Sequence, residues 1–148
     1  MITEFIKYQS VYRVPLAIDL NAGELLWQVA HGETADRVRD HPALQDFDIP
    51  RTGRVGRVGT LVTKTLVIAG DGGVFTSADE RQGARLRAYD KMTGQEIDAV
   101  FLPSSQTGSP MTYSIDGVQY IVVAVGGGTY AGELLAYRLP ESEDNGGA

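Results

Sequence analysis

Apolar and polar side chains alternate most clearly over residues 86–102, where the pattern predicts two β-strands joined by a tight turn. The turn covers residues 90–94, and Gly94 can take the positive φ that closes it. Similar runs bounded by glycine-rich turns predict further strands, but no long helical period occurs. The additional strand-forming runs are residues 11–20, 24–29, 59–63, 65–69, 109–115, 118–125 and 133–139.

The strand–turn–strand sequence pattern of the central segment also occurs earlier in the chain, at residues 16–29. A third, partial copy lies at residues 135–140. The copies lie about forty-five residues apart once a long polar insertion at residues 31–57 is set aside, which is the length of a four-stranded β-propeller blade. The first two copies correspond at Ala17 and Ala88, at Asp19 and Asp90, and at Gly23 and Gly94.

This period predicts an all-β fold, a partial β-propeller of about two and a quarter four-stranded antiparallel blades. So few blades cannot close a ring, so we expect exposed sheet edges that pair with other copies of the chain or with remaining propeller blades. Within one domain over residues 1–148 we expect a lead-in at 1–10, a half blade at 11–29, an insertion loop at 31–57, a full blade at 59–102, a three-stranded blade at 109–139 and a tail at 141–148.

Two irregular segments separate these strands. Residues 31–57 are polar and contain several prolines, and they predict a loop with one helical turn near residues 34–39 that Thr34 caps. Residues 70–84 are rich in glycine and charge and predict a second loop. A third glycine loop is expected at residues 126–132.

Composition excludes several classes of function. Thirteen Lys and Arg residues stand against nineteen Asp and Glu, and the net charge of −6 with no basic stripe argues against a nucleic-acid partner. The absence of Cys rules out disulfides and thiolate metal sites. The longest apolar run, residues 120–125, is too short to span a membrane, and the first ten residues lack the layout of a secretory signal.

Some residues are of the types that bind metal ions or phosphate, but their arrangement in the sequence does not support either kind of site. The spacing of the two histidines in the insertion loop fits no metal-ligand motif, so a solvated loop is the favoured interpretation and we expect no metal. The glycine runs at residues 70–73 and 126–128 precede no helix, so turns are favoured over phosphate binding. No nucleophile–histidine–acid arrangement is indicated, and no catalytic residue is assigned. The residues considered for a metal are His31, Glu33, Asp36, Asp40 and His41.

The repeated text carries a family motif. It resembles the tryptophan-docking motif of the pyrroloquinoline quinone (PQQ) dependent dehydrogenases, which are eight-bladed propellers. Residues 59–73, 108–128 and 133–140 are similar to the C-terminal end of the quinoprotein glucose dehydrogenase branch. The motif stands here as Ala17, Asp19, Gly23 and Trp27, and again as Ala88, Asp90, Thr93 and Gly94 with Asp98 in place of the tryptophan.

The resemblance implies a structural role for the motif. The tryptophan stacks on the turn of the next blade and its N–H finds a carbonyl, while the aspartate caps the turn and the glycine permits it. We therefore expect Trp27 to join two blades. The resemblance also implies that PQQ and calcium serve the parent enzymes. The catalytic aspartate, the calcium ligands and the aromatic platform under PQQ belong to the middle of those enzymes and match nothing in this chain, so PQQ-binding residues stay unknown.

Substrate-facing residues follow from the propeller arrangement, in which the interblade loops lie on the cofactor face. Asp71, Asp79, Arg81 and Tyr130 would then line the entrance for a sugar or polyol, and the alternative is that they are solvated loop residues. Glucose-oxidising relatives carry a histidine where this chain has Gly128, which argues against glucose as the substrate.

The sequence therefore predicts the C-terminal blades of a periplasmic PQQ-dependent alcohol or sugar dehydrogenase, without activity on their own. A second hypothesis is a non-catalytic binding or scaffolding module whose blades self-assemble into a stable oligomer. A third is a truncated reading frame without a function of its own, which in-frame propeller repeats upstream would identify.

Overall fold

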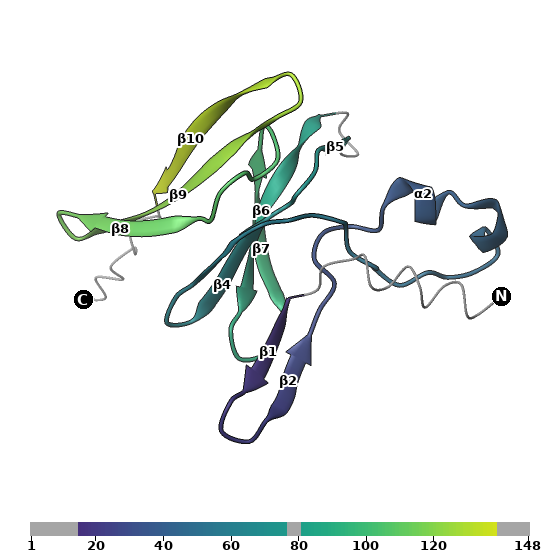
Figure 1. The fold of residues 1–148 in the computed structure, drawn as a ribbon, viewed down its shortest axis with the longest axis horizontal. Coiled ribbons are helices and arrows are strands. Elements are labelled where there is room, and N and C mark those ends of the chain that lie inside the picture. The colour runs from purple at the N-terminus through teal and green to yellow at the C-terminus, as the bar shows by residue number, and fades with distance from the viewer. Residues whose placement is uncertain (1–14, 77–80, 139–148) are drawn as a thin grey trace, which may run out of the picture.

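The computed structural model describes residues 15–76 and 81–138, which form ten β-strands, one α-helical turn and one 3-10 turn (Figure 1). The strands are β1 (Leu16–Asp19), β2 (Glu24–Gln28), β3 (Thr60–Val62), β4 (Leu66–Gly70), β5 (Phe75–Thr76), β6 (Gln82–Asp90), β7 (Glu96–Leu102), β8 (Met111–Ile115), β9 (Val118–Gly127) and β10 (Tyr130–Arg138). The helical turns are α2 (Asp36–Arg39) and η1 (Pro42–Leu44).

The strands form three antiparallel sheets. The first hairpin consists of β1 and β2. The central sheet places β3, β4, β6 and β7 side by side, with β5 paired to the start of β6. The last sheet has the order β10-β9-β8. Figure 1 shows the first hairpin and the last sheet on opposite sides of the central sheet, and the described sheets do not close a ring. Because nearly all the regular structure is strand, the all-β prediction is confirmed.

Three predictions about the loops were wrong in detail, the first of them the glycine loop at residues 126–132, where β9 extends to Gly127 and β10 begins at Tyr130. Thr34 does not cap α2, because the N-cap residue is Ala35 and has no side-chain cap, while Thr34 Oγ1 instead accepts a hydrogen bond from Thr52 N. The segment at residues 70–84 is not loop throughout, since it contains β5 and the start of β6. Pairing of Phe75 with Gly83 adds a short extra strand that a glycine-rich sequence does not suggest.

The hydrophobic core joins the central and last sheets. Alternate residues of β9 point inward, among them Val123 and Val125, which are 0% and 1% exposed. They belong to one cluster with Ile68, Leu86 and Leu102 of the central sheet. The Tyr137 hydroxyl adds a hydrogen bond to Phe101 O at 2.9 Å. Apolar packing, with this hydrogen bond in addition, therefore holds the two sheets together.

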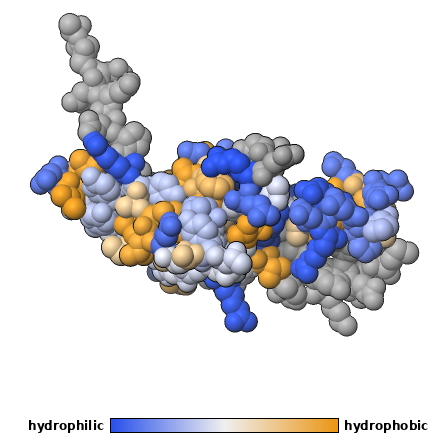
Figure 2. Space-filling view, turned by 90° about the horizontal axis from the view of Figure 1, so that it is seen from above, coloured by the Kyte–Doolittle hydropathy of each residue, from blue (hydrophilic) through white to orange (hydrophobic). Residues whose placement is uncertain are grey.

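The opposite face of the last sheet is apolar and uncovered by the described residues. The register puts Met111 opposite Val122 and Leu134 opposite Ala124, so these side chains share one face. Met111 is 53% exposed and Leu134 is 76% exposed. Figure 2 shows such hydrophobic patches among the hydrophilic surface of the molecule. This face has the character of a surface that packs against another blade.

Candidate functional site

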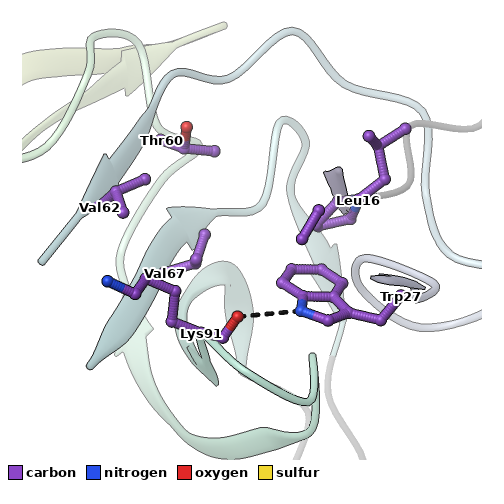
Figure 3. Close-up of a pocket in the computed structure, with 8 residues that line it drawn as sticks. Leu16, Trp27, Thr60, Val62, Val67 and Lys91 are labelled. Carbon is purple, nitrogen blue, oxygen red and sulfur yellow. Dashed lines mark hydrogen bonds between the residues drawn. The ribbon is translucent and has the colours of Figure 1, made fainter. Parts of the chain in front are cut away.

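The first candidate site is the seam between the first hairpin and the central sheet, where Trp27 of β2 lies on the turn after β6. Trp27 Nε1 donates a hydrogen bond to Lys91 O at 2.9 Å (Figure 3). Gly94 is buried under the ring, and a Cβ added to it would lie 2.6 Å from Trp27 Cδ2. Only glycine permits the indole to approach this turn so closely.

The turn under the indole, at residues 90–94, and the turn between β1 and β2, at residues 19–23, have the same construction. The Oδ1 atom of Asp19 accepts hydrogen bonds from two backbone N–H groups of its turn, and Asp90 does the same in the second turn, where it also accepts from the Thr93 hydroxyl. The backbone and side-chain bonds from Thr93 lower the pKa of Asp90. The backbone donors are Asn21 and Ala22 in the first turn and Met92 and Thr93 in the second.

A cavity of about 320 Å³ lies beside the indole. Figure 3 shows Leu16 and Trp27 on one side and Thr60, Val62 and Val67 on the other. Its lining is mostly apolar, and among the described residues that border it Lys91 alone is titratable. The part of the lining that the structure describes therefore belongs to the packing between two sheets and contains no acid–base pair.

The second candidate site is a charged cluster formed by Glu33, Arg51, Asp71, Arg87 and Glu96. Arg87 is 1% exposed, and its Nε donates to Asp71 Oδ1 at 3.1 Å while its Nη1 donates to Glu96 Oε1 at 2.7 Å. Burial opposes the guanidinium charge, but the charges and hydrogen bonds of Asp71 and Glu96 more than compensate and raise the pKa of Arg87. Asp71 is equally buried and accepts a further bond from Arg85 N at 3.0 Å.

His31 lies against this cluster and is 4% exposed. Its Nε2 is 3.0 Å from Gly70 O, which can only accept, so Nε2 carries a proton and donates. Its Nδ1 is 2.8 Å from the Tyr89 hydroxyl. Burial, followed by the charge of Glu96, raises the pKa of Tyr89 to about 12. The expectation that His31 sits in a solvated loop was wrong, because the backbone of β4 and the side chain of β6 supply it with partners.

The insertion loop is attached to the central sheet through the same cluster. Arg51 Nε donates to Gly32 O at 2.7 Å, and its Nη2 donates to Glu96 of β7. Arg54 N donates to His31 O at 2.7 Å, and its guanidinium lies 4.8 Å from the centre of the Phe75 ring. The cluster therefore acts as an anchor for residues 31–57.

The sequence-predicted rim residues have separate surroundings. Asp71 is buried and pairs with Arg87, so its carboxylate faces the interior of this chain. The Arg81 guanidinium lies 4.0 Å from the centre of the Phe101 ring. The Tyr130 hydroxyl donates to Glu133 at 3.0 Å, and burial and Glu133 raise its pKa. Asp79 lies outside the described residues.

The metal candidates also separate. His31 is buried beside Tyr89, whereas His41 is exposed at the start of η1, where its Nδ1 accepts from Ala43 N at 3.2 Å. Asp36 and Asp40 pair with Arg39 on the surface. Glu33 instead lies in the charged cluster, 3.5 Å from Arg87 Nη1. Over residues 15–76 and 81–138, no three His, Asp or Glu side chains are arranged to hold a metal ion.

Sequence reasoning did not single out Arg87, Glu96 or Gln106. Gln106 is 4% exposed; its Oε1 accepts from Gly70 N, and its Nε2 donates to Gly59 O at 2.8 Å. The local pattern gave no signal for Arg87: it alternates with Leu86 and Ala88, which pack in the main core, so it lies on the other face of β6 and is buried there only by residues from other segments.

The open antiparallel sheets and the indole-on-turn seam define the class of protein, an incomplete β-propeller. Residues 6–121 match the family model of the PQQ glucose/ethanol/alcohol dehydrogenase β-propeller domain. The chain therefore belongs to this quinoprotein dehydrogenase family, and the predicted partial propeller is confirmed.

Several relatives match most of the chain. It is 31% identical to quinoprotein glucose dehydrogenase A of Acinetobacter calcoaceticus over 85% of its length. Over 88% of the present chain it is 29% identical to the glycerol dehydrogenase large subunit of Gluconobacter thailandicus. Over 85% of the present chain it is 32% identical to a probable quinate dehydrogenase (quinone) of Xanthomonas campestris pv. juglandis. The chain spans only 15%, 17% and 15% of the lengths of these three relatives.

The two arginines of the charged cluster have acidic partners within this chain. Arg51 pairs with Glu96, and Arg87 pairs with Asp71 and Glu96. Calcium takes several oxygen ligands, and the described residues contain no group of three His, Asp or Glu side chains that could hold a metal ion. No helix in residues 15–76 and 81–138 has the length and apolar character that a membrane crossing requires.

Proposed function

We propose that the chain forms the C-terminal blades of a PQQ-dependent alcohol or sugar dehydrogenase of the periplasm, in which they complete the propeller and support the rim of the pocket. The match of residues 6–121 to the family's propeller domain carries this proposal. The short span of the chain relative to its relatives supports the proposal that the oxidation requires a larger enzyme.

Equilibrium dialysis of the purified chain against PQQ and calcium tests the proposal that other blades are required to bind the cofactor. We expect circular dichroism to show folded β-structure and dialysis to show no retention of PQQ at micromolar concentration, because no complete cofactor site is formed by the described residues. Binding near 1 μM, which corresponds to about −8 kcal/mol, would contradict the proposal that other blades are required. Bovine serum albumin at the same concentration controls for non-specific retention.

A self-assembling scaffold is the second candidate, and it is favoured by the uncovered apolar face and the edge position of β10. Among the described strands β10 pairs only with β9, and its nine residues contain no Pro, although Glu133 and Arg138 place two charges along it. Light scattering coupled to gel filtration separates the two: a discrete oligomer supports the scaffold, whereas a monomer or non-specific aggregate supports blades of a larger enzyme.

A further inference from the structure

The cavity beside the indole has hydrocarbon walls from two sheets. Its volume of about 320 Å³ lies at the lower end of the range for small-ligand sites in proteins. The hydrophobic residues that border it are Leu16, Ala17, Trp27, Val62 and Val67. Leu16 is 50% exposed and Val62 is 59% exposed, so part of this apolar lining faces solvent in the described part of the chain. A ligand with a hydrocarbon chain would remove that surface from water.

The charge at the border of this cavity is positive. The Nζ atom of Lys91 donates a long hydrogen bond to Thr63 O at 3.4 Å. No Asp or Glu within residues 15–76 and 81–138 forms an ion pair with Lys91. Because Thr63 follows Val62, the ammonium lies on the β3 side of the cavity, and Figure 3 shows it pointing away from the indole. The cavity therefore has an apolar end at Trp27 and a cationic end at Lys91.

We propose that this cavity is a binding site for a free medium-chain fatty acid, with a hydrocarbon tail of about eight carbons. The tail would pack against Trp27 and the apolar lining, and the carboxylate would accept a hydrogen bond from Lys91 Nζ. A neutral hydrocarbon would leave the ammonium without an acidic partner, and a cationic amphiphile would bring like charges together. The inference goes beyond the proposed function, because it involves no oxidation step and no family cofactor.

Binding of a fatty acid is compatible with the contact between the first hairpin and the central sheet. The indole N–H bonds the backbone carbonyl of Lys91, so this hydrogen bond does not use the ammonium that the carboxylate requires. The ring covers Gly94 and also borders the cavity. The chain contains one Trp, so its fluorescence reports directly on a ligand beside this ring.

The test is quenching of Trp27 fluorescence in the full chain by two brominated octanoates at pH 7. The bromine is at the end of the tail in 8-bromooctanoate and next to the carboxylate in 2-bromooctanoate, and bromine quenches an indole only near contact. We expect 8-bromooctanoate to quench more strongly at saturation, with a dissociation constant of about 0.1 to 1 mM. Unlabelled octanoate should displace it and restore the fluorescence.

The head group is tested with a ligand of opposite charge. Octylammonium has a tail of the same length, and we expect it to bind about tenfold more weakly than octanoate, because its charge would face the ammonium of Lys91. Its affinity is measured by displacement of 8-bromooctanoate from the same cavity.

Lys91→Met keeps an unbranched side chain and the backbone carbonyl but removes the charge. We expect it to weaken octanoate binding about fivefold and to narrow the difference between octanoate and octylammonium. Lys64→Met is the matched control, since Lys64 lies in the turn between β3 and β4 and does not border the cavity. It should leave both affinities unchanged.

Four results would overturn the inference. They are no saturable quenching by 8-bromooctanoate, equal quenching by the two isomers, octylammonium that binds as tightly as octanoate, and a folded Lys91→Met variant with unchanged affinity for octanoate. Circular dichroism checks the fold of the variant, and the two isomers and octylammonium decide the question in the unchanged chain if that variant does not fold.

Discussion

At the scale of single residues, Trp27 forms the polar contact that holds the first hairpin to the central sheet. Its ring covers Gly94, and its N–H satisfies Lys91 O. None of the described residues of the hairpin belongs to the main hydrophobic cluster. Much of the stability of this seam should therefore depend on one side chain.

Substitution of Trp27 separates the two parts of this contact. Trp27→Phe removes the N–H and should lower the free energy of unfolding by about 1 kcal/mol, while Trp27→Ala also removes the ring and should lower it by about 3 kcal/mol. Urea unfolding followed by circular dichroism measures both values. Phe47→Ala serves as the control, since Phe47 is 68% exposed and should change stability by less than about 0.5 kcal/mol. Equal stability of all three variants would contradict the claim that Trp27 stabilises the contact between the first hairpin and the central sheet.

Tyr89 gives the chain a distinctive alkaline titration. Because burial raises its pKa to about 12, the folded state retains the phenol proton that the unfolded state loses near pH 10. The resulting contribution to stability is complete below pH 10 and is lost as pH rises from 10 to about 12. Absorbance at 295 nm should show Tyr89 ionising after the exposed tyrosines, and Tyr89→Phe should remove this late phase. A Tyr89→Phe titration identical to that of the unchanged chain would refute this assignment.

At the scale of elements, the charged cluster determines where the insertion loop lies. Asp71→Asn keeps the size of the side chain but removes the charge that faces buried Arg87. We expect a loss of about 3 kcal/mol and faster tryptic cleavage within residues 31–57, because the loop loses its anchor. Asp40→Asn is the exposed control and should change stability by less than about 0.5 kcal/mol. Unchanged cleavage of the Asp71 variant would show that the loop is held by other contacts.

The strands and the two turns follow from local pattern, so the sequence predicts them well. Alternation identifies β6 and β7, and the aspartate–glycine spacing identifies both turns. The charged cluster escapes prediction because its members come from four separate segments, namely the insertion loop, the residue after β4, β6 and β7, and meet only after the sheet forms. His31 illustrates the reason: a histidine in a polar loop looks solvated until Tyr89 and Gly70 provide its buried partners.

At the scale of the whole molecule, the described residues leave apolar surfaces at both ends, and their hydrophobic core lies between the two larger sheets. The outer face of the last sheet exposes Met111, Ile115 and Leu134. In isolation we expect this face to promote association of chains, and Leu134→Lys to reduce it by placing a charge at its most exposed position. Static light scattering across a concentration series measures the change. Lys64→Leu, at an exposed residue of the turn between β3 and β4, reports the opposite effect of added apolar surface. Scattering unaffected by Leu134→Lys would exclude this face.

The most direct test of the account is a dye-reduction assay with PQQ and calcium. It compares this chain with the product of its reading frame extended through the upstream propeller-coding sequence, on glucose, glycerol, quinate and 1-butanol. We predict that the extended product oxidises at least one of these substrates and that the chain alone oxidises none. Dye reduction by the chain alone, or an extended product that lacks further blades and activity, would contradict the proposal that these are the C-terminal blades of a quinoprotein dehydrogenase.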